Sequence, residues 1–180
     1  MNYKLIYIVL VILPLYETKR KLRSVYFIDT KSDINEKYIK NLEIDISPKR
    51  DSMKILIEIV QDISDVWATV GVGRWQTSTK NFRSMFSYHI DLCDTLLRLK
   101  TAQLPLLNKW ITNFLKYGNI SSQCPFYKSV YYLNNLKVDK DSIPEFVPAG
   151  KYQTYLSLYR KNKDGSKDVI NSSYMTFELK

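Results

Sequence analysis

The stretch that decides the fold is residues 42–59, with the sequence LEIDISPKRDSMKILIEI. Residues 42–46 alternate apolar and acidic side chains, and this period of two places the apolar set on one face of a β-strand. The run PKRDS at 48–52 turns the chain. Residues 53–60 carry apolar side chains on both phases, which predicts a central strand that is covered on both faces.

The same alternation recurs along the rest of the chain. Further strands are predicted at residues 25–28, 66–72, 82–90, 130–138, 152–159 and 174–179. In the predicted strand 82–90, one phase of the alternation, and hence one face of the strand, holds Phe82, Phe86, Tyr88 and Ile90. Gly71 and Gly73 predict a bulge or tight bend, and Asp164-Gly165 predicts a hairpin turn between the last two strands.

The spacing of apolar residues changes from the strand period of two to helical spacing only between residues 92 and 117. Helical spacing is followed first by Leu92, Leu96 and Leu99, and then by Leu104, Leu107, Ile111, Phe114 and Leu115. Gly118 is predicted to end the second helix as a left-handed C-terminal cap. The predicted fold is mainly β: an antiparallel β-sandwich or open β-cup of seven to eight strands with a two-helix insertion.

The composition excludes several classes of protein. Lys and Arg number 27 against 18 Asp and Glu, a formal charge of +9, but outside residues 19–23 they are spread singly among acidic residues. No stripe can follow a phosphate backbone, so we expect no nucleic-acid partner. With one histidine and two cysteines we also expect no metal site. His89 and Asp91 merely share a strand face and no hydrolase motif occurs, so we expect neither an enzyme nor a cofactor.

The N-terminal residues have the pattern of a secretory signal peptide. A twelve-residue apolar run at 5–16 follows Lys4 and is too short to span a bilayer. We assign residues 1–18 to the signal peptide, with a boundary open by several residues, and residues 19–180 to a single domain. The expected location is therefore secreted and extracellular, and the mature chain is not expected to be an integral membrane protein.

A secreted protein folds in an oxidising compartment, where cysteines commonly form disulfides. Cys93 and Cys124 allow one intramolecular disulfide, which would close a loop of about thirty residues. Two buried free thiols or an intermolecular bridge are the alternatives. The sequons at Asn119 and Asn171 predict glycosylation.

Two linked motifs carry a resemblance to a known family. They are KYGNISSQCPF at 116–126 and YYLNNLKVDKDSIPEFVPAGKY at 131–152. They resemble the insect secreted family of unknown-function domains that includes the CheA and CheB chemosensory proteins, and the similarity is clearest over residues 82–159. That family is related to the lipid-recognition fold of the ganglioside activator protein. The resemblance implies a hydrophobic cup that holds a lipid-like molecule.

The candidate ligand-binding residues follow from this expectation. Helices inserted between strands could hold one edge of the cup open, and Phe146 between two prolines could close an end. The proposed cavity lining comprises Phe86, Leu104, Leu107, Trp110, Ile111, Phe114, Tyr131 and Phe146. For each of these residues the alternative is ordinary core packing.

The sequence thus predicts a secreted binder or carrier of a small apolar ligand, namely a lipid, pheromone or cuticular hydrocarbon, in chemosensory or gustatory perception. Two alternatives stay open. One is an extracellular module that acts on a membrane receptor without a ligand. The other is a lipid-presenting cofactor of an enzyme.

Overall fold

The computed structural model describes residues 23–99 and 105–180. Over these residues the chain is mainly β, with 55% strand, eight strands in two antiparallel sheets, two short helices and no closed barrel. This confirms the predicted fold class. In chain order the elements are β1 (Val25–Ile34), β2 (Ile39–Ile46), β3 (Met53–Ile59), β4 (Val66–Gln76), β5 (Asn81–Asp91), α2 (Leu92–Leu97), α3 (Pro105–Leu115), β6 (Ser129–Leu136), the 3-10 helix η2 (Lys140–Ser142), β7 (Gly150–Lys161) and β8 (Lys167–Leu179). The predicted signal peptide lies outside the described residues.

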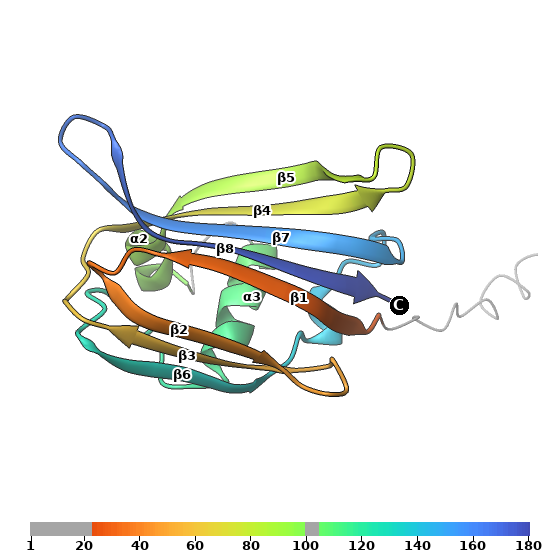
Figure 1. Cartoon of the computed structure of the whole chain (residues 1–180), viewed down its shortest axis with the longest axis horizontal. Helices are drawn as coiled ribbons and strands as arrows, with labels where there is room; N and C mark the ends of the chain where they lie inside the picture. The colour runs from red at the N-terminus through yellow and green to blue at the C-terminus, as the bar shows by residue number, and fades with distance from the viewer. Residues whose placement is uncertain (1–22, 100–104) are drawn as a thin grey trace, which may run out of the picture.

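The strands form a five-stranded sheet A, in the order β1-β8-β7-β4-β5, and a three-stranded sheet B, in the order β2-β3-β6. Sheet A lies above sheet B in Figure 1, and α3 lies between them. The chain passes from sheet A to sheet B between β1 and β2. It passes again through the helices, which join the edge strand β5 of sheet A to the edge strand β6 of sheet B.

Strand β3 is central in sheet B, as predicted. It is not covered on both faces, however, because Leu56 is 36% exposed on the outer face. Its neighbours on β6, Val130 and Tyr132, are 48% and 43% exposed. An antiparallel sheet can bury one face and leave the other in solvent, and sheet B does so.

A bulge changes which side chains of β5 point inward. Val72 pairs with Phe86 but Gly73 pairs with Ser84, so Met85 is an extra residue on β5. The irregularity predicted near Gly73 is therefore confirmed. The phase predicted for Phe82 is wrong, because the extra residue turns it to the outer face, where it packs edge-on against Trp75 at 5.0 Å between ring centres.

Gly118 does not cap a helix in the left-handed conformation, since the positive-φ glycines of the described chain are Gly150 and Gly165. Helix α3 ends earlier, at Leu115. Gly118 instead forms a β-bridge with Leu133, and a Cβ at this position would lie 1.6 Å from the carbonyl oxygen of Tyr132. Glycine is needed here for close backbone approach.

Two strands of sheet A are longer than predicted. β1 continues past Ile28 to Ile34, and β8 begins at Lys167, because the polar halves of these strands still pair along their whole length. The hairpin between β7 and β8 is as predicted. Gly165 turns with φ +84°, and its N–H donates to the carbonyl of Asn162 at 3.0 Å.

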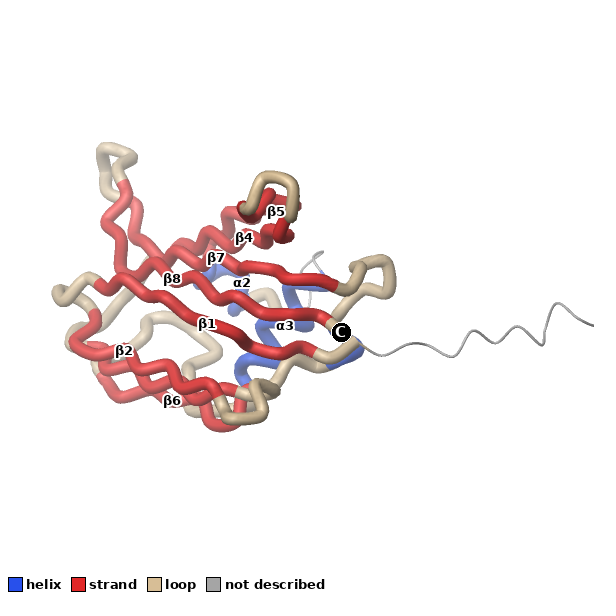
Figure 2. The backbone as a smooth tube through the Cα atoms, turned by 45° about the vertical axis from the view of Figure 1, so that its right-hand side comes forward, coloured by secondary structure: helices blue, strands red, loops and turns tan. Residues whose placement is uncertain are grey.

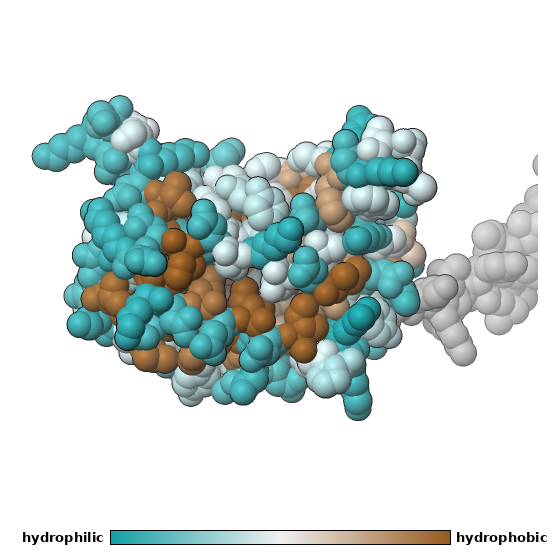
Figure 3. All heavy atoms as spheres, viewed as in Figure 1, coloured by the Kyte–Doolittle hydropathy of each residue, from teal (hydrophilic) through white to brown (hydrophobic). Residues whose placement is uncertain are grey.

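The buried hydrophobic residues form four clusters between the sheets. Figure 2 shows both helices behind β1 and β8, on the inner side of sheet A. On the face seen in Figure 3, hydrophobic side chains gather over β1 and β2, where the two sheets meet. The sandwich is thus joined by β1 and β2 along one side and by the helical insertion along the other.

Candidate functional site

Helix α3 contributes side chains to both sheets. Ile111 packs against the cluster of Ala68 and Ile90 on sheet A, and Phe114 packs against the cluster that contains Leu133 of sheet B. Trp110 stacks on Phe86 with 6.2 Å between ring centres. The helix therefore acts as a wedge whose apolar residues separate the sheets.

The inner face of sheet A is least covered in its middle. The strand register aligns five inward-facing residues in one row across all five strands, which we call the central row: Tyr88, Val70, Leu156, Ser173 and Ser32. Ser32 is exposed and the other four are only half-buried. In a filled sandwich the middle of the inner face is the part expected to be most buried.

The neighbouring residues of β4 are covered more fully than Val70. On β4, Ala68 and Val72 lie two residues to either side of Val70 and are 1% and 9% exposed. Side chains two apart on a strand share a face, so exposure rises in the middle and falls again on both sides. Along β4, the inner face of sheet A thus has a half-covered residue between two buried ones.

The central row changes from apolar to polar across the sheet. At the β5 end, Tyr88 lies beside Phe86 with 5.5 Å between ring centres. At the β1 end, the hydroxyls of Ser32 and Ser173 share a hydrogen bond of 3.0 Å. Ser173 also donates to Oδ1 of Asn171 at 3.2 Å. A molecule lying along this row would meet apolar groups at one end and hydroxyls at the other.

Three of the predicted lining residues, Trp110, Ile111 and Phe114, lie on α3 and pack in three different core clusters, and a fourth, Phe86, stacks on Trp110. The Trp110 ring is held in place by its Nε1–H, which donates to the carbonyl of Ser142 at 3.3 Å. Leu104 lies outside the described residues, and the side chain of Leu107 is not among those described.

The other two predicted lining residues lie elsewhere. Tyr131 is 8% exposed on β6, and its hydroxyl donates to the carbonyl of Tyr127 at 2.9 Å. Phe146 is 83% exposed, so the prediction that it closes an end of the cup is wrong. The adjacent Ile143 and Val147 pack on the core cluster instead, which leaves Phe146 at the outside of the turn.

The two cysteines form the disulfide Cys93–Cys124, with 5.5 Å between Cα atoms, and the described residues hold no free cysteine. Cys93 follows sheet A at the start of α2, and Cys124 precedes β6 of sheet B. The bridge predicted as one of three alternatives is confirmed, and it ties the two sheets together beside the helical insertion.

The two sequons differ in their surroundings. Asn171 is 6% exposed on the inner face of sheet A, so its side chain is buried in the folded chain. Asn119 is exposed, but its side chain is engaged by the edge of β6. Its Nδ2 donates to the carbonyl of Val130 at 3.1 Å, and its Oδ1 accepts from the N–H of Tyr132 at 2.7 Å.

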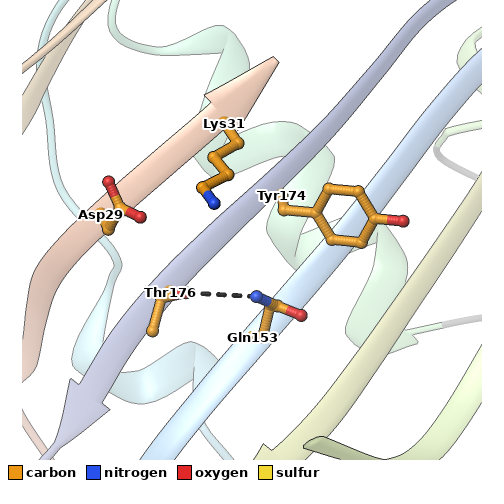
Figure 4. A pocket seen from close by; sticks show the side chains of 5 residues that line it. All are labelled: Asp29, Lys31, Gln153, Tyr174 and Thr176. Atoms are coloured by element: carbon orange, nitrogen blue, oxygen red, sulfur yellow. Dashed lines mark hydrogen bonds between the residues drawn. The ribbon is translucent and has the colours of Figure 1, made fainter. Parts of the chain in front are cut away.

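A pocket that the sequence did not suggest lies on the opposite, outer face of sheet A. It has a volume of about 290 Å³ and is lined by Asp29, Lys31, Gln153, Tyr174 and Thr176. Figure 4 shows these side chains on β1, β8 and β7, with a hydrogen bond of 3.3 Å from Gln153 Nε2 to Thr176 Oγ1. The alternation of Asp29, Lys31 and Asp33 along β1 is the sequence signal that could have pointed to it.

Two further properties concern the described part of the chain. No helix in residues 23–99 or 105–180 has the length and apolar character needed to cross a membrane. The same residues contain no group of three or more His, Cys, Asp or Glu side chains arranged to hold a metal ion.

Comparison with known proteins gives a family match over part of the chain. No curated protein matches the sequence. The matched segment begins in β4, contains β5, the described helices and β6, and ends in β7, so it includes the disulfide and the helix that separates the sheets. Residues 69–154 match the domain family DUF1091, which is described as a protein of unknown function.

Proposed function

We propose that the protein is a secreted binder or carrier of a small apolar ligand, such as a lipid, pheromone or cuticular hydrocarbon. The observation that carries this proposal is the half-buried central row of sheet A, opposite the wedge of α3. Apolar side chains that the protein itself leaves partly uncovered gain free energy when a ligand covers them, at about 25 cal/mol per Å².

Two other observations support the proposal. The disulfide is the kind of crosslink found in extracellular proteins, and it favours secretion. The DUF1091 match at residues 69–154 covers most of the segment that resembles the CheA and CheB proteins, which favours a chemosensory or gustatory role and the lipid-recognition type of cup. The proposal assigns no catalytic activity to the chain.

The polar end of the central row narrows the ligand class. A purely apolar chain that buries about ten methylenes gains roughly 8 kcal/mol, and association costs several of these. A head group bonded to Ser32 and Ser173 would add to this free energy, and roughly 8 kcal/mol net corresponds to a Kd of about 1 μM. We therefore propose a ligand with an alkyl tail and one polar head, bound with low-micromolar affinity.

Displacement of a dansyl-labelled fatty acid from the delipidated protein tests the proposal. Leu156→Ala removes an apolar contact from the central row and should weaken binding about tenfold, a change of about 1.4 kcal/mol. The control Leu56→Ala makes the same truncation on the solvent-exposed outer face of sheet B and should leave binding unchanged. Ser32→Ala should weaken the binding of ligands that carry a polar head group and leave the binding of plain hydrocarbons unchanged.

A filling variant gives a second, independent readout. Val70→Phe adds a ring in the middle of the central row, so it should abolish ligand binding without unfolding the protein if that space normally receives the ligand. If the space is normally filled by side chains, the added ring should instead lower the free energy of unfolding by about 1–3 kcal/mol. Failure of correctly folded protein to bind any apolar ligand at about 50 μM would favour the receptor-interaction alternative.

A further inference from the structure

The outer face of sheet A carries a second site, defined by two adjacent rows of the strand register. Gln153 pairs with Thr176, which pairs with Asp29. In the next row Tyr155 pairs with Tyr174, which pairs with Lys31. Five of these six residues line the pocket of about 290 Å³. Because side chains two apart share a strand face, this pocket and the central row lie on opposite faces of one sheet.

Two glycines of β4 lie beside the pocket on the neighbouring strand. On β4, Gly73 pairs with Gln153 and Gly71 pairs with Tyr155. The floor therefore continues from the polar pocket across two glycines. Beyond them, aromatic rings stand on the same face, where Trp75 packs against Phe82 with 5.0 Å between ring centres.

Polar groups in the pocket have unused bonding capacity. Across the described chain, no hydrogen bond or ion pair joins the side chain of Asp29 or Lys31 to another side chain. These two side chains lie two residues apart on one strand face, yet they are not paired with each other. Gln153 uses one N–H of its amide on Thr176, which leaves the amide oxygen available.

An aromatic surface borders these polar groups. The rings of Tyr155 and Tyr174 are 4.9 Å apart between centres, and Tyr174 is 44% exposed. Figure 4 shows the Tyr174 ring reaching from β8 over the neighbouring β7, beside Gln153. The exposed ring offers a flat apolar platform whose edge carries a hydroxyl.

The charges decide which class of ligand fits. Asp29 and Lys31 carry opposite charges two residues apart, so together they give the pocket no net charge to attract an anion or a cation, while an apolar molecule would desolvate both without giving hydrogen bonds in return. A neutral molecule with several hydroxyls can donate to the carboxylate of Asp29 and accept from the ammonium of Lys31, because each hydroxyl both donates and accepts. We propose that this pocket binds a neutral saccharide, with one sugar ring against Tyr174 and its hydroxyls bonded to Asp29, Lys31 and Gln153.

An NMR titration of ¹⁵N-labelled full-length protein tests this site directly. The probes are maltotetraose, cellotetraose and chitotetraose, each taken to about 20 mM, because a shallow open pocket should give a Kd on the order of 1 mM. At least one probe should shift the amide signals of β1, β7 and β8 around the pocket. Vesicles with and without galactosylceramide form a further arm, which distinguishes a lipid-borne sugar from a free one.

Two variants and one matched control locate the binding. Tyr174→Ala removes the platform and Asp29→Asn removes the charged acceptor, and each should raise the Kd at least tenfold. Tyr132→Ala is the control, because Tyr132 is equally exposed, at 43%, but lies on the outer face of sheet B. The Kd of the Tyr132→Ala variant for the oligosaccharide should equal that of the unmodified protein.

Three outcomes would overturn the proposal. The first is that neither the oligosaccharides nor the glycolipid vesicles bind. The second is binding that persists in both Tyr174→Ala and Asp29→Asn. The third is binding of glutamine, a zwitterion that could pair with both charges, in place of any sugar. None of these outcomes bears on the apolar ligand, whose site lies on the inner face.

Discussion

The two sheets present different inward faces to each other. On sheet B, the row of Leu133, Ile55 and Ile44 contains a fully buried residue, because Leu133 is 0% exposed, while Ile55 and Ile44 are half-buried. On sheet A the central row stays half-buried, although it occupies the middle of the larger sheet. The difference indicates that removing side-chain atoms at Leu133 costs more stability than removing them from the central row.

Breaking the covalent link between the sheets should have the largest effect. Cys93→Ser opens a crosslink that spans 31 residues, and the chain-entropy estimate for such a loop is about 3–4 kcal/mol of unfolding free energy. Urea unfolding without reductant measures the loss. The double variant with Cys124→Ser should lose about the same amount as either single variant, because the bridge acts as one unit. A loss below about 1 kcal/mol would show that the sheets hold together without it.

The contrast between the sheets can be tested with one truncation made twice. Leu133→Ala should cost roughly 3 kcal/mol, because a fully buried side chain leaves a cavity on removal. Leu156→Ala in the central row should cost less than about 2 kcal/mol, because its surroundings are already partly open. Chemical unfolding of the two ligand-free variants gives the comparison. Equal losses would contradict the difference drawn between the sheets.

Sheet B also depends on a polar contact at its edge. Asn119→Ala should lower the free energy of unfolding by about 1–3 kcal/mol, since it leaves a carbonyl and an N–H of β6 without their partner. Asn134→Ala is the control, an exposed asparagine on the same strand, and should stay within about 0.5 kcal/mol. If both variants behave alike, the edge does not rely on this amide.

The smallest expected effect is on the pH dependence of stability. Hydrogen bonds from Lys37 and then from Tyr38 hold the pKa of Asp168 below its ordinary value of 3.8. The folded state therefore favours the carboxylate form of Asp168. The stability that this carboxylate contributes is fully present above the ordinary pKa and is lost as the pH falls through the lowered pKa of the folded state. Unfolding between about pH 5 and pH 2 should show a shallower slope for Asp168→Asn.

Much of the fold follows from alternation in the sequence. The apolar phases of β2, β3 and β4 identify their inward faces because those strands are regular and the core selects the side chains. Phe82 was placed on the wrong face because one extra residue on β5 reverses the phase, and Met85 carries no local mark of it. The polar half of β1 was missed because residues 29–33 carry polar side chains on both faces of the strand, so hydrophobic alternation is absent there.

The candidate sites were predictable to different degrees. The helical spacing of Ile111 and Phe114 identifies an apolar stripe, although it does not say that the stripe reaches both sheets. The central row could not be foreseen, because it depends on the register of five strands and on what fails to cover them. The outer pocket was missed for a similar reason, since its residues come from three strands that are far apart in the sequence.

The side-chain amide of Asn119 has a consequence for how molecules meet one another. An edge strand normally offers free N–H and C=O groups, onto which a strand of a second molecule can add. At Val130 and Tyr132 these groups already bond to Asn119, whose amide imitates a neighbouring strand without extending the sheet. Gly118 brings the backbone close enough for this to happen. The chain thereby protects part of one edge of sheet B against strand addition and the aggregation that follows from it.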